Sequence, residues 1–297
     1  MAIAANCSST FGNLGAVCNS GNGFGVDVGI ILTTDSFQFD SFTDFATQSV
    51  YTTAIKAKQM FPLMDMQEIE NQSEETTYQT TSLGIDNRLR DGKYKFLYSF
   101  LLTLKQHQEL QKFSSANLRY FRVDERNQIL GYSPDGTTVK GFSISTFEAE
   151  KMGIASADSV AYSPVKITES SPAQLNSFGI NIAPTWEVAS LSSLTNVDVD
   201  VVGTPTATEI VLNVGANVGL NPDGSKALVE ITGLLSADFV VKTTAGATQT
   251  VTFTDNDDGT YTGVGTGLVS GTADIVDPTA LSDGLLIEST GAADVSI

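Results

Sequence analysis

The sequence predicts a mainly β protein: an antiparallel β-sandwich or open barrel with one α-helix, followed by a second β-sandwich. Short stretches that alternate apolar and polar residues recur along most of the 297 residues, and turn sequences separate them. A hydrophobic share of 41% is enough to bury a core in each of two domains. The composition also changes near Asn196. From there to Ile297 two lysines accompany 14 acidic residues, so this third of the chain carries −12 of the formal charge of −18.

The first domain begins with segments that have little to bury. Residues 1–34 are small and Gly-rich, which predicts an extended N-terminal arm that lies against its own domain or a neighbouring subunit. From Ser36 to Ile55 the apolar residues alternate, which predicts two strands separated near Asp44. Residues 65–82 are rich in Thr and Glu, and predict an exposed polar loop or a long hairpin arm.

The rest of the domain at 35–195 predicts strands around a single helix. The helix is expected at about 101–113, where Leu101, Leu104 and Leu110 have helical spacing. Strands are expected at Lys93–Phe100, Leu118–Val123, Gln128–Tyr132, Val139–Phe147, Ser163–Thr168 and Phe178–Val188. We therefore expect a sandwich or open barrel with one helical patch.

Residues 196–297 contain short β-branched runs at regular intervals, and nothing in them indicates a helix. The runs are Val197–Val202, Glu209–Val214, Ala227–Ile231, Phe239–Lys242, Thr248–Thr254, Thr260–Val264 and Thr272–Val276, with possible edge strands at Leu285–Glu288 and Ala293–Ile297. Turns such as Asp257–Gly259 separate them. This spacing predicts an immunoglobulin-like β-sandwich.

The acidic turn within this domain has two interpretations. Asp255, Asp257 and Asp258 could supply carboxylates to calcium, but the glycine comes one position too early for an EF-hand loop, and Thr266 stands where that loop has a glutamate. The favoured interpretation is a fold-defining turn made by Asp258 and Gly259, after which Tyr261 anchors the next strand like a tyrosine corner.

The sequence offers no set of residues from which a catalytic site could be assembled, so we predict neither an enzyme nor a bound cofactor. The one histidine, His107, has no second ligand or nucleophile nearby and is expected at the surface or at the boundary of the core. Cys7 and Cys18 are expected as free thiols in a reducing cytoplasm, with a disulfide formed after cell lysis as the alternative. No apolar run reaches the roughly 20 residues that cross a bilayer, and residues 1–6 lack the pattern of a secretory signal.

Charge places a further limit on function. A chain of net charge −18 repels nucleic acid and anionic membranes. Basic residues are nevertheless grouped within Arg88–Lys95 and within Arg119–Arg126. We expect these groups to contact acidic surfaces of neighbouring copies, especially the polar segment 65–82.

Two groups of residues carry a resemblance to virion proteins of tailed phages. The segment VTFTDNDDGTYT at 251–262 and GTADIV at 271–276 are similar to the terminal strands of bacterial and phage immunoglobulin-like repeats. Tyr120–Gly131 and Asp135–Phe142 resemble hairpins of phage structural proteins. With its lead-in arm, long polar loop and single helix, the chain most resembles a major tail protein, the subunit of the tail tube.

The resemblance implies a self-assembling structural protein. In the tail tube family six copies join their sheets into a ring around a continuous inner barrel, and the rings stack into a tube whose acidic lumen lets DNA pass without specific binding. It implies that the partners are copies of the chain and other tail proteins, and that the chain is made in the host cytoplasm and ends in the virion. Residues 1–34 and 65–82 would make contacts between rings, and residues 196–297 would project outward.

A function of another class remains open. The chain could instead decorate a capsid or fibre, or act as an adhesin-like protein that binds the host surface through its immunoglobulin-like domain.

Overall fold

The computed structural model describes residues 24–80, 82–83, 86–155, 160–220, 226–282 and 285–297. The chain forms two compact units and passes from the first to the second between Ser193 and Leu194. Strands hold 47% of the residues and helices 16%, which confirms the prediction of a mainly β protein. Each unit has its own hydrophobic core.

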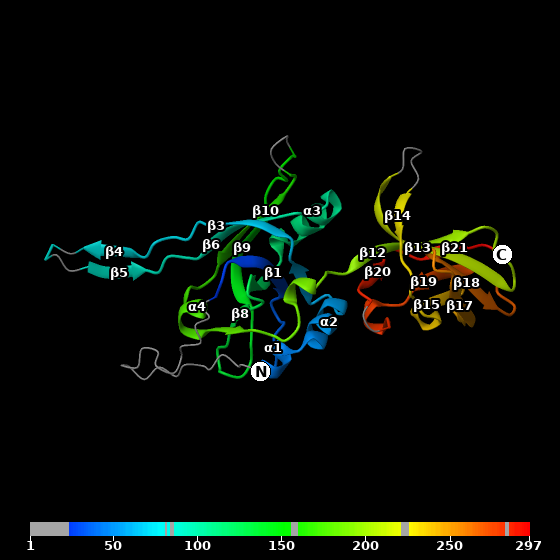
Figure 1. Cartoon of the computed structure of the whole chain (residues 1–297), viewed down its shortest axis with the longest axis horizontal. Coiled ribbons are helices and arrows are strands. Elements are labelled where there is room, and N and C mark those ends of the chain that lie inside the picture. Colours follow the sequence, from blue (N-terminus) through cyan, green and yellow to red (C-terminus); the bar gives the residue numbers. More distant parts are fainter. Residues whose placement is uncertain (1–23, 81, 84–85, 156–159, 221–225, 283–284) are drawn as a thin grey trace. The chain divides into compact units, whose positions relative to one another are not determined.

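A curled antiparallel sheet of nine strands builds the first unit (Figure 1). Its strands are β1 (Asp27–Thr34), β2 (Met60–Leu63), β3 (Met66–Asn71), β6 (Lys95–Phe100), β7 (Leu118–Asp124), β8 (Ile129–Tyr132), β9 (Phe142–Ala149), β10 (Ser163–Glu169) and β11 (Gly179–Ile182). The main path runs β11-β8-β7-β9-β10-β6-β3, and β1 pairs with β2 and β7. Because Arg122 of β7 lies opposite Ile30 of β1 and also opposite Leu130 of β8, β1 and β8 flank β7 on its two sides.

The strand β1 is buried on both faces of the sheet. Ile30 and Leu32 belong to a core that also contains Tyr98 and Tyr120. On the opposite face Ile31 lies beside Phe121 in the register of β1 with β7. A continuous apolar run is typical of such a strand, because both faces need apolar side chains.

Two helices that the sequence did not predict lie between β1 and β2. They are α1 (Phe42–Ala46) and α2 (Gln48–Lys56). The ring of Phe121 lies 5.6 Å from that of Phe39 and 5.5 Å from that of Phe45 at α1, measured between centroids. Tyr51 of α2 lies 4.8 Å from Phe39 and 5.1 Å from Trp186. These rings make a second apolar layer on the face of β7 that bears Phe121.

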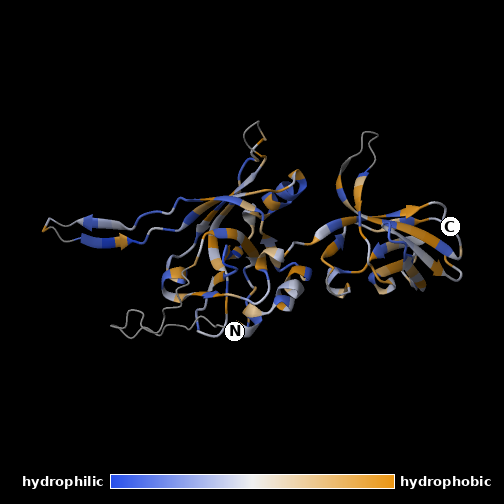
Figure 2. Cartoon of the chain, viewed as in Figure 1, coloured by the Kyte–Doolittle hydropathy of each residue, from blue (hydrophilic) through white to orange (hydrophobic). Residues whose placement is uncertain are grey.

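A ribbon of two strands, β4 (Thr77–Thr80) and β5 (Asp86–Arg90), continues from the edge of the sheet (Figure 1). Gln72 N donates to Lys95 O at 2.8 Å and Glu74 N donates to Lys93 O at 2.9 Å, so hydrogen bonds link the ribbon to β3 and β6. Figure 2 shows that β4 and β5 are mostly hydrophilic, in contrast to the strands of the sheet.

The second unit is a sandwich of two sheets around one core. Its strands are β12 (Thr195–Val202), β13 (Glu209–Leu220), β14 (Lys226–Glu230), β15 (Phe239–Thr243), β16 (Thr248–Gln249), β17 (Val251–Asp255), β18 (Thr260–Gly265), β19 (Gly271–Ile275), β20 (Ile287–Ser289) and β21 (Ala293–Val295). One sheet has the order β17-β18-β13-β12-β20, with β14 on β13, and the other has the order β16-β15-β19-β21. Three short 3₁₀ helices, Val188–Ser190 before this unit and Ser236–Asp238 and Pro278–Ala280 within it, complete the connections.

The prediction of one helix at 101–113 was wrong in number and in length. The helix α3 spans Leu104–Gln111, with Thr103 as its N-cap, and a 3₁₀ turn follows at Lys112–Ser115. A fourth helix, α4 (Ala173–Phe178), lies where the sequence predicts a turn or a short helical piece at Pro172–Phe178, and of the strand predicted at Phe178–Val188 only β11 is a strand.

Two other predictions for the first unit were also wrong, and a third had two alternatives, of which the structure has one. The strands predicted between Ser36 and Ile55 are α1 and α2, because Ser41 caps α1 by accepting a hydrogen bond from Asp44 N at 3.1 Å. The arm predicted at 1–34 ends in β1, a buried strand, while residues 1–23 lie outside the described part of the chain. Residues 65–82 contain β3 and β4, so the hairpin arm, rather than the polar loop, is the structure there.

Candidate functional site

The predicted turn at Asp258 and Gly259 separates β17 from β18. Gly259 has a φ of +77°, a conformation that residues with a Cβ atom rarely adopt. A Cβ atom at this position would also lie 2.9 Å from Cβ of Glu230. Asp258 Oδ1 accepts a hydrogen bond from Thr260 N at 3.0 Å, and the hydrogen bonds from Thr260 lower the pKa of Asp258. Glycine and aspartate are therefore each required by the geometry of the turn.

Tyr261 connects this turn to a distant loop. Its hydroxyl group donates to Ile231 O at 2.7 Å and accepts from Leu234 N at 3.3 Å. Its buried ring lies 4.9 Å from that of Phe239. Burial raises the pKa of Tyr261 to about 12, so the hydroxyl keeps its proton at neutral pH. These contacts are those of an anchor residue.

The candidate calcium ligands instead serve the turn itself. Asp255 Oδ1 accepts from Asp257 N at 2.9 Å, and Asp255 Oδ2 accepts from Gly233 N at 2.5 Å. In the described residues, no group of three or more His, Cys, Asp or Glu side chains is arranged to hold a metal ion. The three carboxylates of Asp255, Asp257 and Asp258 therefore do not form a set of ligands.

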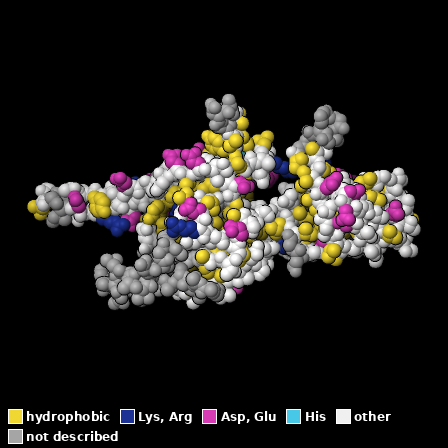
Figure 3. Space-filling view, viewed as in Figure 1, with side chains coloured by type: hydrophobic (Ala, Val, Ile, Leu, Met, Phe, Trp, Pro, Cys, Tyr) yellow, Lys and Arg dark blue, Asp and Glu magenta, His cyan; other side chains and the backbone are white. Residues whose placement is uncertain are grey.

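The ribbon of β4 and β5 is exposed to solvent along its whole length. All the residues of β4 and β5 are exposed. They include apolar side chains: Tyr78 is 58% exposed, Leu83 in the turn 84%, and Leu89 59%. Figure 3 shows hydrophobic side chains in yellow among basic and acidic groups along the ribbon. A hairpin of two strands without a covering layer is only marginally stable in water, and none of the described residues covers this one.

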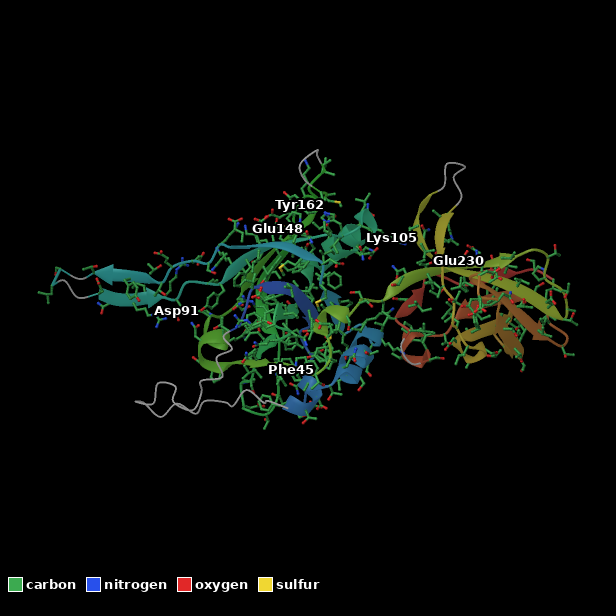
Figure 4. All side chains as sticks on the ribbon, in the orientation of Figure 1. Phe45, Asp91, Lys105, Glu148, Tyr162 and Glu230 are labelled. Carbon is green, nitrogen blue, oxygen red and sulfur yellow. The ribbon has the colours of Figure 1, made fainter. Side chains whose placement is uncertain are left out.

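The base of the ribbon, by contrast, is firmly fixed. Lys95 Nζ lies 2.6 Å from Glu74 Oε1, and Arg90 contacts the other oxygen of the same carboxylate at 3.7 Å. The hydrogen bond from Lys95 lowers the pKa of Glu74. Gly92 allows the two backbone segments at the base of the ribbon to approach closely, because a Cβ atom there would stand 1.8 Å from Glu74 O. Asp91, labelled in Figure 4, pairs with Arg88 at the same end.

Several cations that we expected to contact neighbouring copies are paired within the chain. Arg119 Nε lies 2.8 Å from Asp35 Oδ1, and Arg122 Nε lies 2.9 Å from Asp27 Oδ2. Together with Lys95 and Arg88, these pairs account for basic residues of both groups. Charge alone therefore gives little reason to assign those groups to contacts between copies.

His107 is buried, contrary to the prediction of a surface or boundary position. Its Nδ1 lies 3.1 Å from Ser163 Oγ on β10, and its Nε2 lies 3.1 Å from Gln111 Nε2 one helical turn later. Both ring nitrogens thus have a partner, the buried Ser163 and the exposed Gln111, which favours a structural role. Cys7 and Cys18 lie outside the described residues.

The sequence did not reveal a buried polar cluster inside the first unit. We define the cluster as Asp27, Tyr98, Tyr120, Arg122 and Glu169, which come from β1, β6, β7 and β10. Arg122 forms two hydrogen bonds with Asp27, and Tyr120 hydrogen-bonds to Glu169. Because its members are far apart along the chain, no motif could have identified the cluster.

The second unit carries a polar hollow lined by Asp198, Asp200, Lys226, Thr290 and Asp294, among others. Lys226 Nζ lies 3.2 Å from Asp198 and 3.8 Å from Asp200, and Asn217 donates to Asp198 at 3.0 Å. These contacts leave Asp198 well satisfied without a ligand.

No family model, curated protein or solved structure matches the chain. No helix in the described residues combines the length and apolar character needed to cross a membrane.

Proposed function

We propose that the chain is a virion structural protein without enzymatic activity, and specifically a phage tail tube subunit that assembles with copies of itself into stacked rings. The observation that carries this proposal is the ribbon of β4 and β5, whose residues are all exposed. A segment of this kind is stabilised when a neighbouring subunit covers it.

The ends of the nine-stranded sheet provide further support. Among the described residues, β3 pairs only with β6 and β11 pairs only with β8, so each has one edge to which no described strand is paired. Exposed edges of this kind can pair with a strand of another chain. In a ring of tail tube subunits, neighbouring sheets join at such edges.

The charge of the chain suits a channel for DNA. Residues 1–195, which would surround the lumen, carry −6, the remainder of −18 after the −12 of residues 196–297, and this negative charge opposes binding to phosphates, so DNA would pass such a surface without being held. We place the mature protein in the phage tail, with other tail proteins as its further partners, and its synthesis in the host cytoplasm.

Negative-stain electron microscopy of the purified full chain tests the proposal. We expect uniform rings or hollow tubes at high protein concentration. A single monomeric species at the same concentration, measured by analytical ultracentrifugation, would refute self-assembly.

Exposed apolar residues on the second unit favour one alternative. Val218 on β13 and Val229 on β14 are both more than half exposed, and they could contact a host surface or a capsid. In that case the purified protein stays monomeric or trimeric and binds host cells or polysaccharide. The two functions are thus separated by the oligomeric state and by a cell-binding assay.

A further inference from the structure

Four buried side chains of the polar cluster lie in the core of the first unit. Glu169 Oε1 lies 2.7 Å from the hydroxyl oxygen of Tyr120. The hydroxyl group of Tyr98 lies 3.3 Å from Asp27 Oδ2. These four side chains thus form two separate pairs, each of one tyrosine and one carboxyl group.

In each pair the phenol donates its single hydrogen to the carboxyl group, Tyr120 to Glu169 Oε1 and Tyr98 to Asp27 Oδ2. The second oxygen of Glu169, Oε2, is buried and has no hydrogen-bond partner among the described residues. Burial with so few donors disfavours the charged form of a carboxyl group, so Glu169 is the group expected to hold a proton.

The surrounding donors serve Asp27 and Asp124 more fully than they serve Glu169. Arg122 Nε donates to both oxygens of Asp27, at 3.2 and 2.9 Å. Asp124 accepts three backbone hydrogen bonds, from Gly25 N at 2.6 Å, Arg126 N at 3.0 Å and Gln128 N at 2.8 Å. Burial raises the pKa of Asp27, but Arg122 and Tyr98 act in the opposite direction and favour its anion.

Glu169 has much less support as an anion. Its side chain is fully buried, and Oε2 has no hydrogen-bond partner. The one nearby guanidinium, that of Arg122, is already bound to Asp27. Burial raises the pKa of Glu169 to about 7, against the lowering effects of Tyr120 and Arg122. The ionisable groups that act on the two buried carboxyls are Asp27 on β1, Tyr98 on β6, and Tyr120, Arg122 and Asp124 on β7. His107 contacts the opposite end of β10, at Ser163.

The same cluster also holds the chain that leads into β1. The guanidinium carbon of Arg122 lies 5.3 Å from the ring centroid of Phe24 and 4.8 Å from that of Phe96. Gly25 N donates to Asp124, and Asp27 binds Arg122. The segment Phe24–Asp27 is thus fixed by Arg122 and by the carboxylate of Asp124.

We propose that Glu169 is a proton-binding site that controls how firmly the segment Phe24–Asp27 is held. With the proton bound, Glu169 is neutral and Arg122 serves Asp27 and Phe24 alone. When the proton leaves, a second buried anion repels Asp27 and competes for Arg122, which weakens the hold on the segment.

Hydrogen–deuterium exchange of the full chain between pH 5 and 8.5 tests this proposal. After correction for the intrinsic pH dependence of exchange, the amides of residues 25–30 should lose protection by up to about tenfold per pH unit towards pH 7 and level off above it. Glu169→Gln, which imitates the protonated acid, should remove this dependence. Glu148→Gln, an exposed change on the adjacent strand β9 (Figure 4), should behave as the unmodified chain.

Protection that is constant with pH in the unmodified chain would overturn the proposal, as would a Glu169→Gln variant that keeps the full pH dependence. Because the pH dependence is also measured on the unmodified chain, the proposal can be refuted even if the Glu169→Gln variant fails to fold. Infrared spectroscopy should show the C=O absorption of a protonated carboxyl group at pH 6, and its loss above pH 8. Absence of that absorption at pH 6 would equally refute the assignment.

Discussion

The hydroxyl group of Tyr261 donates a hydrogen bond to the backbone carbonyl oxygen of Ile231, 30 positions earlier in the chain, over 2.7 Å. The hydroxyl oxygen of Tyr261 also accepts a hydrogen bond from Leu234 N. One buried hydroxyl group therefore satisfies two backbone groups of the connection between β14 and β15. A loop that would otherwise leave these groups unpaired is thereby attached to the core of the sandwich.

Replacing Tyr261 with phenylalanine should destabilise the second unit by about 1–3 kcal/mol, because Ile231 O and Leu234 N lose their partner while the ring remains. Urea unfolding followed by circular dichroism measures the change. The fluorescence of Trp186, the one tryptophan of the chain, reports on the first unit, because its indole donates to Ala46 O at 2.9 Å. The urea midpoint of the Trp186 fluorescence should not change. A shift of that midpoint without a loss of stability in the second unit would contradict the prediction.

Gly259→Ala should cost more stability than Gly246→Ala, although both glycines have positive φ angles of +77° and +83°. At Gly246 an added Cβ atom has open space, so the cost is the backbone strain of about 1 kcal/mol. At Gly259 the contact with Glu230 adds to the strain. Thermal unfolding of the two variants provides the comparison, and equal losses would show that the turn relaxes around the new methyl group.

The stability of the first unit should depend on the proton of Glu169. The folded chain raises this pKa from 4.5 to about 7, so the stabilisation is present below about pH 4.5, declines as pH rises, and is lost once pH passes 7. The full effect amounts to roughly 3 kcal/mol. Urea unfolding monitored by Trp186 fluorescence at pH 5 and pH 8 should show this difference in the unmodified chain, and a much smaller one in Glu169→Gln.

Assembly should depend on the apolar residues of the ribbon. Replacing Tyr78, Leu83 and Leu89 together with serine removes exposed apolar surface that a neighbouring copy would cover, so the variant should stay monomeric in sedimentation experiments. The fold should persist, because none of these side chains is buried. Serine at Val218 and Val229 is the matched control, and we expect it to assemble normally. Assembly of the ribbon variant would show that other surfaces join the copies.

The strands of the second unit could be predicted closely from the sequence. The expected strand at Thr260–Val264 is β18 (Thr260–Gly265), and the expected one at Val197–Val202 lies within β12. Half-buried strands between turns leave a clear alternation in the sequence, because each strand shows one face to the core and one to solvent.

The first unit was harder to predict because its core has two layers. Phe39 and Phe45 have the spacing of a strand, but Phe45 lies on a helix. The residues buried in α2, such as Tyr51 and Ala54, have helical spacing, which the β-branched pair Thr52 and Thr53 between them conceals. The sequence predicts an arm where β1 forms, because glycines surround its apolar run and a strand that is buried on both faces shows no alternation of apolar and polar residues. The polar cluster could not be predicted at all, since only the sheet brings Asp27 close to Glu169.

The position of β1 has a consequence for how the first unit unfolds. Ile30 and Leu32 complete one core, and Ile31 shares the opposite face with Phe121. Neither layer can keep its packing once β1 detaches, because each would then expose a row of apolar side chains to water. The core that contains Ile30 and Leu32 and the helical layer on the opposite face of the sheet should therefore unfold in one cooperative step, with no intermediate that retains only one of them.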